Sequence, residues 1–330
     1  MKPFATVITS FLVLLLVCSQ QTTASFAPFA AVQTATKPEL PNHLLYDAQQ
    51  RALALLSSSR QSGFEELWGW KEKQWTRLSG TGPAARELGG AVYDTQRQRI
   101  VLYGGIGRGA EERRGDTWEW DGKRWRQMPD TSVGPRDHHA LAYDEARGKT
   151  VLYSGSQSGA ALATDTWEWD GAKWTQVATQ GPGGRAHFGM VYDNRRKQVI
   201  LFGGLDESSK KYNDLWAWDG KRWQKLGEGG PLPRYRHAMA FDRQAGVLVL
   251  YGGLGARQPP GALEDTWIWD GQHWQEIKTA GPGKRSSHLM AYDAVRGKTV
   301  LHGGNFWDGK VSTNYDDTWE WDGKQWTQIK

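Results

Sequence analysis

Three features of the sequence predict an all-β fold made of six sheets with four antiparallel strands each. Tryptophans recur in sets of three at a spacing of about fifty residues, and only Trp307 lies outside these sets. Within each period, runs rich in β-branched and aromatic residues alternate with turn residues, as strands and hairpins do. Two glycines end the second of these runs in most periods. A repeat of this length predicts a solenoid or a propeller, because one unit cannot bury its apolar face alone.

The tryptophan sets mark the third and fourth strands of six repeats. In each set two tryptophans are separated by one residue, as on one face of a strand, and the third follows after a turn. The sets are Trp68, Trp70 and Trp75; Trp118, Trp120 and Trp125; Trp167, Trp169 and Trp174; Trp216, Trp218 and Trp223; Trp267, Trp269 and Trp274; and Trp319, Trp321 and Trp326.

A complete repeat is clearest in residues 181–224. A short apolar run at 187–193 is followed by a polar turn and by a β-branched and aromatic run at 198–204. After a variable polar loop, residues 214–218 alternate with a period of two. We expect Asp219-Gly220 to supply the positive φ angles of a tight hairpin before the last strand. Four short antiparallel strands therefore make one blade.

Two motifs recur at equivalent places in the other repeats. Glycine at the end of the second strand permits a sharp bend and a close approach of neighbouring backbone. The double glycine occurs at Gly104-Gly105, Gly203-Gly204, Gly252-Gly253 and Gly303-Gly304, with Ser154-Gly155 as a variant. The hairpin pair occurs at Asp121-Gly122, Asp170-Gly171, Asp219-Gly220, Asp270-Gly271 and Asp322-Gly323.

The first repeat departs from the others, as a terminal repeat is expected to. Its strands match at 43–47, 53–57 and 66–70, but it lacks both glycine motifs and has Lys71-Glu72-Lys73 in the turn. We therefore predict a six-bladed β-propeller closed by packing of whole blades. Its blades are expected at about 38–79, 80–130, 131–178, 179–227, 228–278 and 279–330.

These repeats resemble Kelch repeats over roughly Pro38 to the C-terminus, because they combine the double glycine, the spaced aromatic residues and the final tryptophan. The resemblance implies a β-propeller, including the type found in galactose oxidase relatives. It says little about function, since propellers carry many unrelated activities.

The N-terminus has the pattern of a secretory signal peptide, predicted for residues 1–24. Lys2 precedes the apolar run Phe11–Val17, and Thr22-Thr23-Ala24 suits a small-residue cleavage site. The alternative is lipid attachment at Cys18, which Val17 disfavours because a small residue is expected before a lipidated cysteine. Residues 25–37 are then a linker, in which 32–35 resembles an outer strand that could add to the last blade. We expect a secreted or periplasmic protein.

Cysteine usage and charge exclude several classes of function. Cys18 is the only cysteine, so the mature protein would have no disulfide, no thiolate metal site and no cysteine–tyrosine copper cofactor. We expect no cofactor and no metal. The net charge is +5, with basic residues spread through turns, which argues against a nucleic-acid surface. No segment besides the leader suggests a membrane, and we expect a monomer.

Strand direction sorts the loops onto two faces of the predicted propeller. The loops before the first strand and after the second strand share one face and vary, so this variable-loop face is the expected functional face. It carries five arginines, each seven residues before the aromatic that ends the first strand, and blade 1 has Glu39 there instead. The arginines are Arg86, Arg136, Arg185, Arg234 and Arg285.

The arginine positions have two interpretations. They could line the channel mouth and bind carboxylates, sulfates or phosphates, together with Arg236 and His139, His187, His237 and His288. The more economical interpretation is a structural tie, because each arginine has an aspartate in its own blade. The aspartates are Asp116, Asp165, Asp214, Asp265 and Asp317. The histidines have the same alternative, as satisfied residues at a strand start, and His138-His139 would seed a metal site only if carboxylates converged there.

Departures from the repeat are better binding candidates, because symmetry does not require them. Trp307 lies in the last variable loop and could stack on a sugar ring, with packing against blade 1 as the alternative. Tyr212 and Tyr315 could join that surface, and His302, which replaces an aromatic residue before the double glycine, is expected in the core.

The sequence shows no catalytic constellation, and on balance we do not expect an enzyme. We predict a binding module for glycans or a protein partner on the variable-loop face. The alternatives are an epimerase or mutarotase of acidic sugars, like some Kelch-type enzymes, and a structural envelope protein. For the enzyme, Glu87 and His139 at the channel mouth are the first acid and base candidates.

Overall fold

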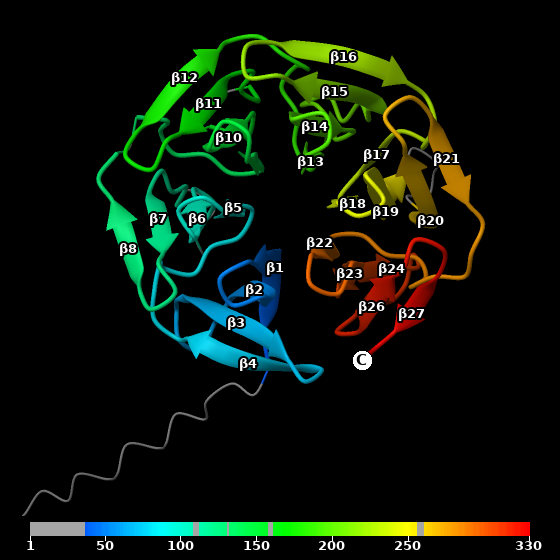
Figure 1. Ribbon diagram of the computed structural model, residues 1–330, viewed down its shortest axis with the longest axis horizontal. Helices are drawn as coiled ribbons and strands as arrows, with labels where there is room; N and C mark the ends of the chain where they lie inside the picture. Colours follow the sequence, from blue (N-terminus) through cyan, green and yellow to red (C-terminus); the bar gives the residue numbers. More distant parts are fainter. Residues whose placement is uncertain (1–36, 108–111, 131, 158–160, 256–260) are drawn as a thin grey trace, which may run out of the picture. The chain divides into compact units, whose positions relative to one another are not determined.

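The computed structural model describes residues 37–107, 112–130, 132–157, 161–255 and 261–330, which form a ring of six four-stranded antiparallel sheets (Figure 1). The prediction of an all-β, six-bladed propeller is confirmed. The predicted leader, the possible outer strand at 32–35 and Cys18 lie outside the described residues. Within the described ranges no helix is long and apolar enough to cross a membrane.

Each blade is a meander whose first strand lies nearest the ring axis. Blade 1 contains β1 (Leu40–Asp47), β2 (Ala52–Ser58), β3 (Glu65–Lys71) and β4 (Gln74–Ser79). Blade 2 contains β5 (Gly90–Asp94), β6 (Arg99–Tyr103), β7 (Thr117–Trp120) and β8 (Trp125–Met128). Blade 3 contains β9 (Ala140–Asp144), β10 (Lys149–Tyr153), β11 (Thr166–Trp169) and β12 (Trp174–Ala178).

The last three blades follow the same order, with additions. Blade 4 contains β13 (Gly189–Asp193), β14 (Gln198–Phe202), β15 (Asp214–Trp218) and β16 (Trp223–Glu228). Blade 5 contains β17 (Arg234–Tyr235), β18 (Ala238–Asp242), β19 (Val247–Gly255), β20 (Ala262–Trp269) and β21 (Trp274–Ile277). Blade 6 contains β22 (Leu289–Asp293), β23 (Lys298–His302), β26 (Thr318–Trp321) and β27 (Trp326–Gln328), and a separate hairpin of β24 (Asn305–Trp307) and β25 (Ser312–Asn314).

The ring closes by packing of complete blades. The innermost strands contact one another in the order β1, β5, β9, β13, β18, β22 and back to β1. Blade 6 supplies all four of its own strands from the C-terminal part of the chain. Apolar core layers lie between neighbouring blades: one contains Val101 and Tyr103 of blade 2 with Leu152 and Trp169 of blade 3.

The repeated tryptophans hold the blades together through both packing and hydrogen bonds. In β11 the period of two places Trp167 and Trp169 toward blade 2, while Glu168 between them faces blade 4 and accepts the indole N–H of Trp218 at 3.0 Å. Trp169 pairs with Trp174 across the hairpin, with ring centroids 5.5 Å apart.

The hairpin turns differ in one detail from the prediction. Gly220 has a φ of 92°, but Asp219 is not in the positive region. Its Oδ1 instead accepts the backbone N–H groups of Lys221 and Arg222 at 2.8 and 2.9 Å. The expectation of two positive φ angles was therefore wrong for the aspartate, whose role is to cap the turn.

Candidate functional site

The two faces of the ring are distinct in structure. One face carries the loops between blades and the loops that join the second and third strands, and we keep the name variable-loop face for it. The other carries the turns after the first strand and the aspartate–glycine hairpins, and we call it the turn face. Backbone and side-chain hydrogen bonds join successive turns on the turn face, as from Gln96 to the carbonyl of Glu145 at 2.9 Å.

The five predicted arginines are buried and paired with the predicted aspartates. Arg86 is 2% exposed and the other four are 0% exposed. Each guanidinium forms two hydrogen bonds with its aspartate, and the ion-pair distances are 2.6–2.8 Å. The pairs are Arg86–Asp116, Arg136–Asp165, Arg185–Asp214, Arg234–Asp265 and Arg285–Asp317.

Arg185 illustrates how each arginine ties its blade together. Its Nη1 also donates to the carbonyl of Gly203 at 3.0 Å, and Trp216 donates its indole N–H to Asp214 at 2.8 Å. Burial alone would raise the pKa of Asp214, but the hydrogen bonds and charge of Arg185 hold that pKa below its usual value. Tyr212 lies over the guanidinium at 4.5 Å, as Tyr315 does over Arg285 at 4.3 Å. This geometry favours the structural interpretation of the five arginines over ligand binding.

Blade 1 replaces this tie with a different pair. Glu66, at the position of the aspartates, is 1% exposed and bonds Arg77 of the outer strand at 3.2 Å. Glu39, which takes the place of the arginine, instead accepts the backbone N–H of Arg60 at 2.7 Å. The terminal repeat thus keeps an ion pair at this position, but its arginine, Arg77, comes from the outer strand instead of the loop before the first strand.

Three of the predicted histidines pack between blades. His139 Nε2 lies 3.1 Å from the carbonyl of Tyr103, and His288 Nε2 lies 3.1 Å from that of Tyr251. Burial lowers the pKa of both to about 3, so the rings are neutral and Nε2 donates. The His237 ring stands edge-on to Phe202 at 5.6 Å, and burial lowers its pKa. His302 is also in the core, 3% exposed.

The double glycines make room for these histidines. A Cβ on Gly104 would lie 2.8 Å from His139 Cε1 and 2.7 Å from the carbonyl oxygen of Arg136. A Cβ on Gly203 would meet His237 Cε1 at 3.0 Å. The first glycine of both pairs therefore has to lack a side chain for two reasons: its own turn has a positive φ, and the histidine and a backbone carbonyl of the next blade occupy the space of a Cβ.

A second ring of equivalent residues surrounds the channel mouth on the variable-loop face. All five residues have left-handed backbone, with φ between 54° and 58°, and lie one or two residues before the first residue of their blade that lines the channel. Hydrogen bonds join neighbours, as from His138 N to Leu88 O at 2.8 Å and from Arg236 N to His187 O at 3.0 Å. This mouth ring consists of Leu88, His138, His187, Arg236 and Ser287.

The mouth ring differs from the arginine ring because its side chains differ from blade to blade. His138 Nδ1 lies 2.5 Å from Asp137, a 1% exposed carboxylate that also bonds Arg113 at 2.6 Å. The His138 and His187 rings are perpendicular, with centroids 4.4 Å apart. Burial, followed by the charges of His138 and Arg236, lowers the pKa of His187 to about 3.

The structure thus separates the predicted site residues into two groups. His187 and Arg236 lie together at the mouth, whereas the five paired arginines and His139, His237 and His288 lie inside the blades. The predicted site omitted His138 and missed Asp137. A histidine that directly follows an acid in only one of the six repeats was the available signal. Glu87 is exposed, at the position equivalent to Asp137.

Exposed apolar side chains gather on the variable-loop face. Eight large hydrophobic residues are exposed among those described, and five of them lie in its loops. Trp307, 52% exposed, and Val311, 61% exposed, belong to the β24–β25 hairpin and its turn. The other three are Phe64, Leu88 and Leu232. Scattered exposed hydrophobics are ordinary, and the larger share on this face makes it the candidate interaction surface.

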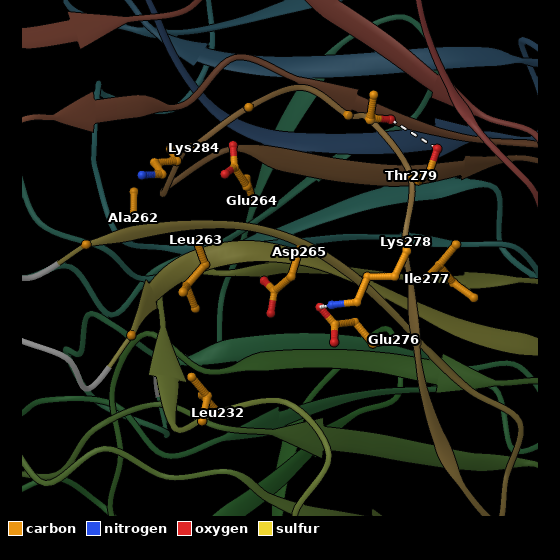
Figure 2. A pocket seen from close by; sticks show the side chains of 15 residues that line it. Leu232, Ala262, Leu263, Glu264, Asp265, Glu276, Ile277, Lys278, Thr279 and Lys284 are labelled. Carbon is orange, nitrogen blue, oxygen red and sulfur yellow. Dashed lines mark hydrogen bonds and ion pairs between the residues drawn. The ribbon is translucent and has the colours of Figure 1, made fainter.

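A cavity of about 660 Å³ opens among the loops of the same face beside blade 5. Figure 2 shows its lining, in which Leu232, Leu263 and Ile277 supply apolar surface. Lys278 and Glu276 pair at 2.5 Å at its side. The volume is within the range of small-molecule and side-chain pockets. Nothing in the sequence indicated it, because its walls come from three separate loops.

No metal centre forms in the described part of the chain, where no three histidine, cysteine, aspartate or glutamate side chains are placed to hold an ion.

Comparisons with known proteins agree with this architecture. Residues 162–330 match the family model described as the KLHDC2/KLHL20/DRC7 Kelch-repeats domain. A solved structure titled "Structure of YjhT" superposes with a TM-score of 0.68 at 13% identity, covering 90% of this chain and 99% of that one. At this identity the match shows the fold alone. No curated protein matches the sequence.

Proposed function

The chain belongs to the Kelch-repeat family, whose model spans just over half of it, and from that premise we propose that it is a secreted or periplasmic monomer that binds a partner protein through its variable-loop face. The family supports a binding or scaffold role in general. The observation that carries the proposal is the concentration of exposed hydrophobic residues on this face and in no comparable number elsewhere among the described residues.

The face combines the parts of a protein interface. Trp307 and Leu232 offer large apolar contacts, and aromatic anchors of this kind supply much of the binding energy of interfaces. The cavity beside Leu232 can seat an apolar side chain of the partner. His138, His187 and Arg236 at the mouth add polar contacts that select among partners.

The proposal is tested by affinity capture from the source cells with matched variants. A variable-loop-face variant with Leu232→Asp and Trp307→Asp should lose a partner that the wild type retains. A turn-face variant with Val295→Asp, also an exposed hydrophobic residue, should keep it. Loss in both variants, or in the turn-face variant alone, would refute the proposed face.

A glycan is the other partner that the face suits, through stacking on Trp307. Such a ligand at a hundred times its Kd should stabilise the fold by about 2.7 kcal/mol. A thermal-shift screen with neutral and acidic sugars should show that gain for the wild type and not for Trp307→Ala. An equal shift in both proteins excludes the stacking role.

A second candidate function, acid–base chemistry on a bound sugar, is supported by the Asp137–His138 pair. A buried carboxylate on Nδ1 orients an imidazole and leaves Nε2 to exchange a proton, as in general bases. Turnover of an acidic sugar that falls at least about 100-fold in His138→Ala, and less in Glu87→Gln, would support it. Turnover unchanged in His138→Ala would remove this candidate.

A further inference from the structure

The net positive charge of the chain is concentrated on the turn face. Its turns contain 19 lysine and arginine residues against 13 acidic residues, a net charge of +6, whereas the whole chain carries +5. Glu119, Glu168 and Glu320, which lie just outside these turns, pair with three of the counted arginines, so with them the face has 19 basic against 16 acidic residues and carries +3 of the chain's +5. These turns are residues 47–51, 71–73, 94–99, 121–124, 144–149, 170–173, 193–197, 219–222, 242–246, 270–273, 293–298 and 322–325.

Six of the thirteen acidic residues of these turns are buried. The aspartates that follow the innermost strands are between 0% and 4% exposed. In the hairpins, one oxygen of each aspartate accepts two backbone N–H groups, as Asp121 does from Lys123 and Arg124, both at 2.9 Å. The buried aspartates are therefore withdrawn from the surface, whereas four of the hairpin aspartates stay between 29% and 56% exposed beside the basic residues that follow them.

The basic side chains at the hairpin tips are exposed and form no close side-chain contacts. The nearest acid of Arg124 is 3.8 Å away, and that of Arg222 is 3.9 Å away. Exposed bases occur at the tips of five of the six blades, and blade 5 has His273 there. They are Lys71, Lys73, Lys123, Arg124, Lys173, Lys221, Arg222 and Lys324.

The arrangement around the ring indicates the shape of the partner. Hydrogen bonds between successive turns, as from Gln49 N to Tyr93 Oη at 3.1 Å and from Gln244 N to Tyr292 Oη at 3.2 Å, keep all the turns at one end of the ring. A linear polyanion could contact only a few neighbouring tips, whereas a plane could contact the tips of all blades. A flat anionic surface fits this distribution better than nucleic acid or a polysaccharide does.

We infer that the turn face binds electrostatically to membrane surfaces rich in anionic lipid headgroups. Each basic residue near such a surface contributes about a five-fold gain in partitioning at physiological salt. Strand direction already sorts these turns onto one face, but the basic residues are scattered along the sequence, which does not show which of them are exposed. The inference is independent of the proposed partner on the variable-loop face, and it leaves that face directed away from the membrane.

Sedimentation with lipid vesicles tests the inference. Vesicles of phosphatidylcholine with about one third phosphatidylglycerol should bind the protein, and vesicles of phosphatidylcholine alone should not. Binding should disappear in high salt, where the Debye length falls to about 3 Å. Unchanged binding in high salt, or equal binding to neutral vesicles, would overturn it.

A pair of charge-matched variants locates the binding face. The turn-face variant replaces Lys123, Arg124, Lys221 and Arg222 with glutamine and should partition at least about 100-fold more weakly. The control replaces Lys210, Lys211, Lys284 and Lys310 on the variable-loop face with glutamine and should bind like the wild type. Equal weakening of vesicle binding in both variants would show that binding depends on net charge alone and not on the turn face, which would overturn the inference. Binding to heparin or DNA without binding to vesicles would equally overturn the inference.

Discussion

Two rings of equivalent residues lie only two positions apart in the sequence, yet they differ in every physical respect. The arginine ring repeats one side chain in five blades, is at most 2% exposed, and pairs each guanidinium with an aspartate of its own blade. The mouth ring repeats only its backbone, with φ near 55°, and carries leucine, histidine, arginine and serine side chains. A repeated side chain therefore marks what holds the propeller together, and a repeated backbone with differing side chains marks where it can recognise something.

The largest expected effect separates the two rings by stability. Arg185→Ala should lower the free energy of unfolding by about 3–5 kcal/mol, because it leaves the Asp214 carboxylate without its buried partner. Arg236→Ala, in the mouth ring, should change the free energy of unfolding by less than about 0.5 kcal/mol. Urea unfolding of both variants measures the difference. Similar losses in both would show that the mouth ring is structural too.

Acid should destabilise the protein through its buried histidines. His139 and His288 have pKa values of about 3 in the fold, against 6.5 when exposed in the unfolded chain. Between these values the unfolded chain binds more protons, so stability is complete above pH 6.5 and is lost as the pH falls toward 3. Each such histidine should account for about 2 kcal/mol of loss by pH 5.

Unfolding of His139→Gln at two pH values isolates that contribution. The gap in unfolding free energy between the variant and the wild type should be about 2 kcal/mol smaller at pH 5 than at pH 7.5. A gap that does not change with pH would show that His139 is protonated or exposed in the fold.

A smaller effect is expected where a side chain repeats in only some blades. Glu119 accepts the indole N–H of Trp169 from the next blade at 2.9 Å and pairs with Arg97. Its counterpart in blade 4 is Ala217, and there the Trp269 indole N–H has no partner within the described residues. Glu119→Ala should cost about 1–3 kcal/mol in thermal or urea unfolding, since it leaves a buried donor unpaired. A neutral result would mean that water replaces the carboxylate.

The smallest effect on stability is expected at the exposed aromatic residue. Trp307→Ala should change the free energy of unfolding by less than about 0.5 kcal/mol, because the side chain is 52% exposed on a separate hairpin. Thermal unfolding checks this. A loss above about 2 kcal/mol would instead support packing of Trp307 against its surroundings.

The sequence predicted the fold because the features that form it repeat. The tryptophan sets, the double glycines and the strand periods all indicate the same four-stranded blade. A complete repeat can therefore be aligned with an incomplete one, such as the first, to locate its strands. The sequence also identified the arginine–aspartate pairs and favoured a structural tie, but it left ligand binding open. That choice depends on burial, which the identity of the residues does not fix.

The candidate site was harder to predict because adjacent residues differ in burial: one faces the channel mouth and the next is buried between blades. His138 and His139 are adjacent, yet the left-handed φ of 58° at His138 turns its side chain to the mouth while His139 enters the space between blades. The sequence favoured His139, which the structure buries. The five exposed hydrophobics come from loops in four blades, which strand direction assigns to one face, but the sequence does not show which side chains of those loops are exposed.

The proposed function places the partner on the variable-loop face and its mouth ring. The most direct test is histidine footprinting with diethylpyrocarbonate, with and without the captured partner. The side chain of His138 is 24% exposed on the variable-loop face, and that of His273 is 81% exposed on the turn face. We expect the partner to protect His138 and to leave His273 fully reactive. Protection of His273 with His138 unchanged would contradict it.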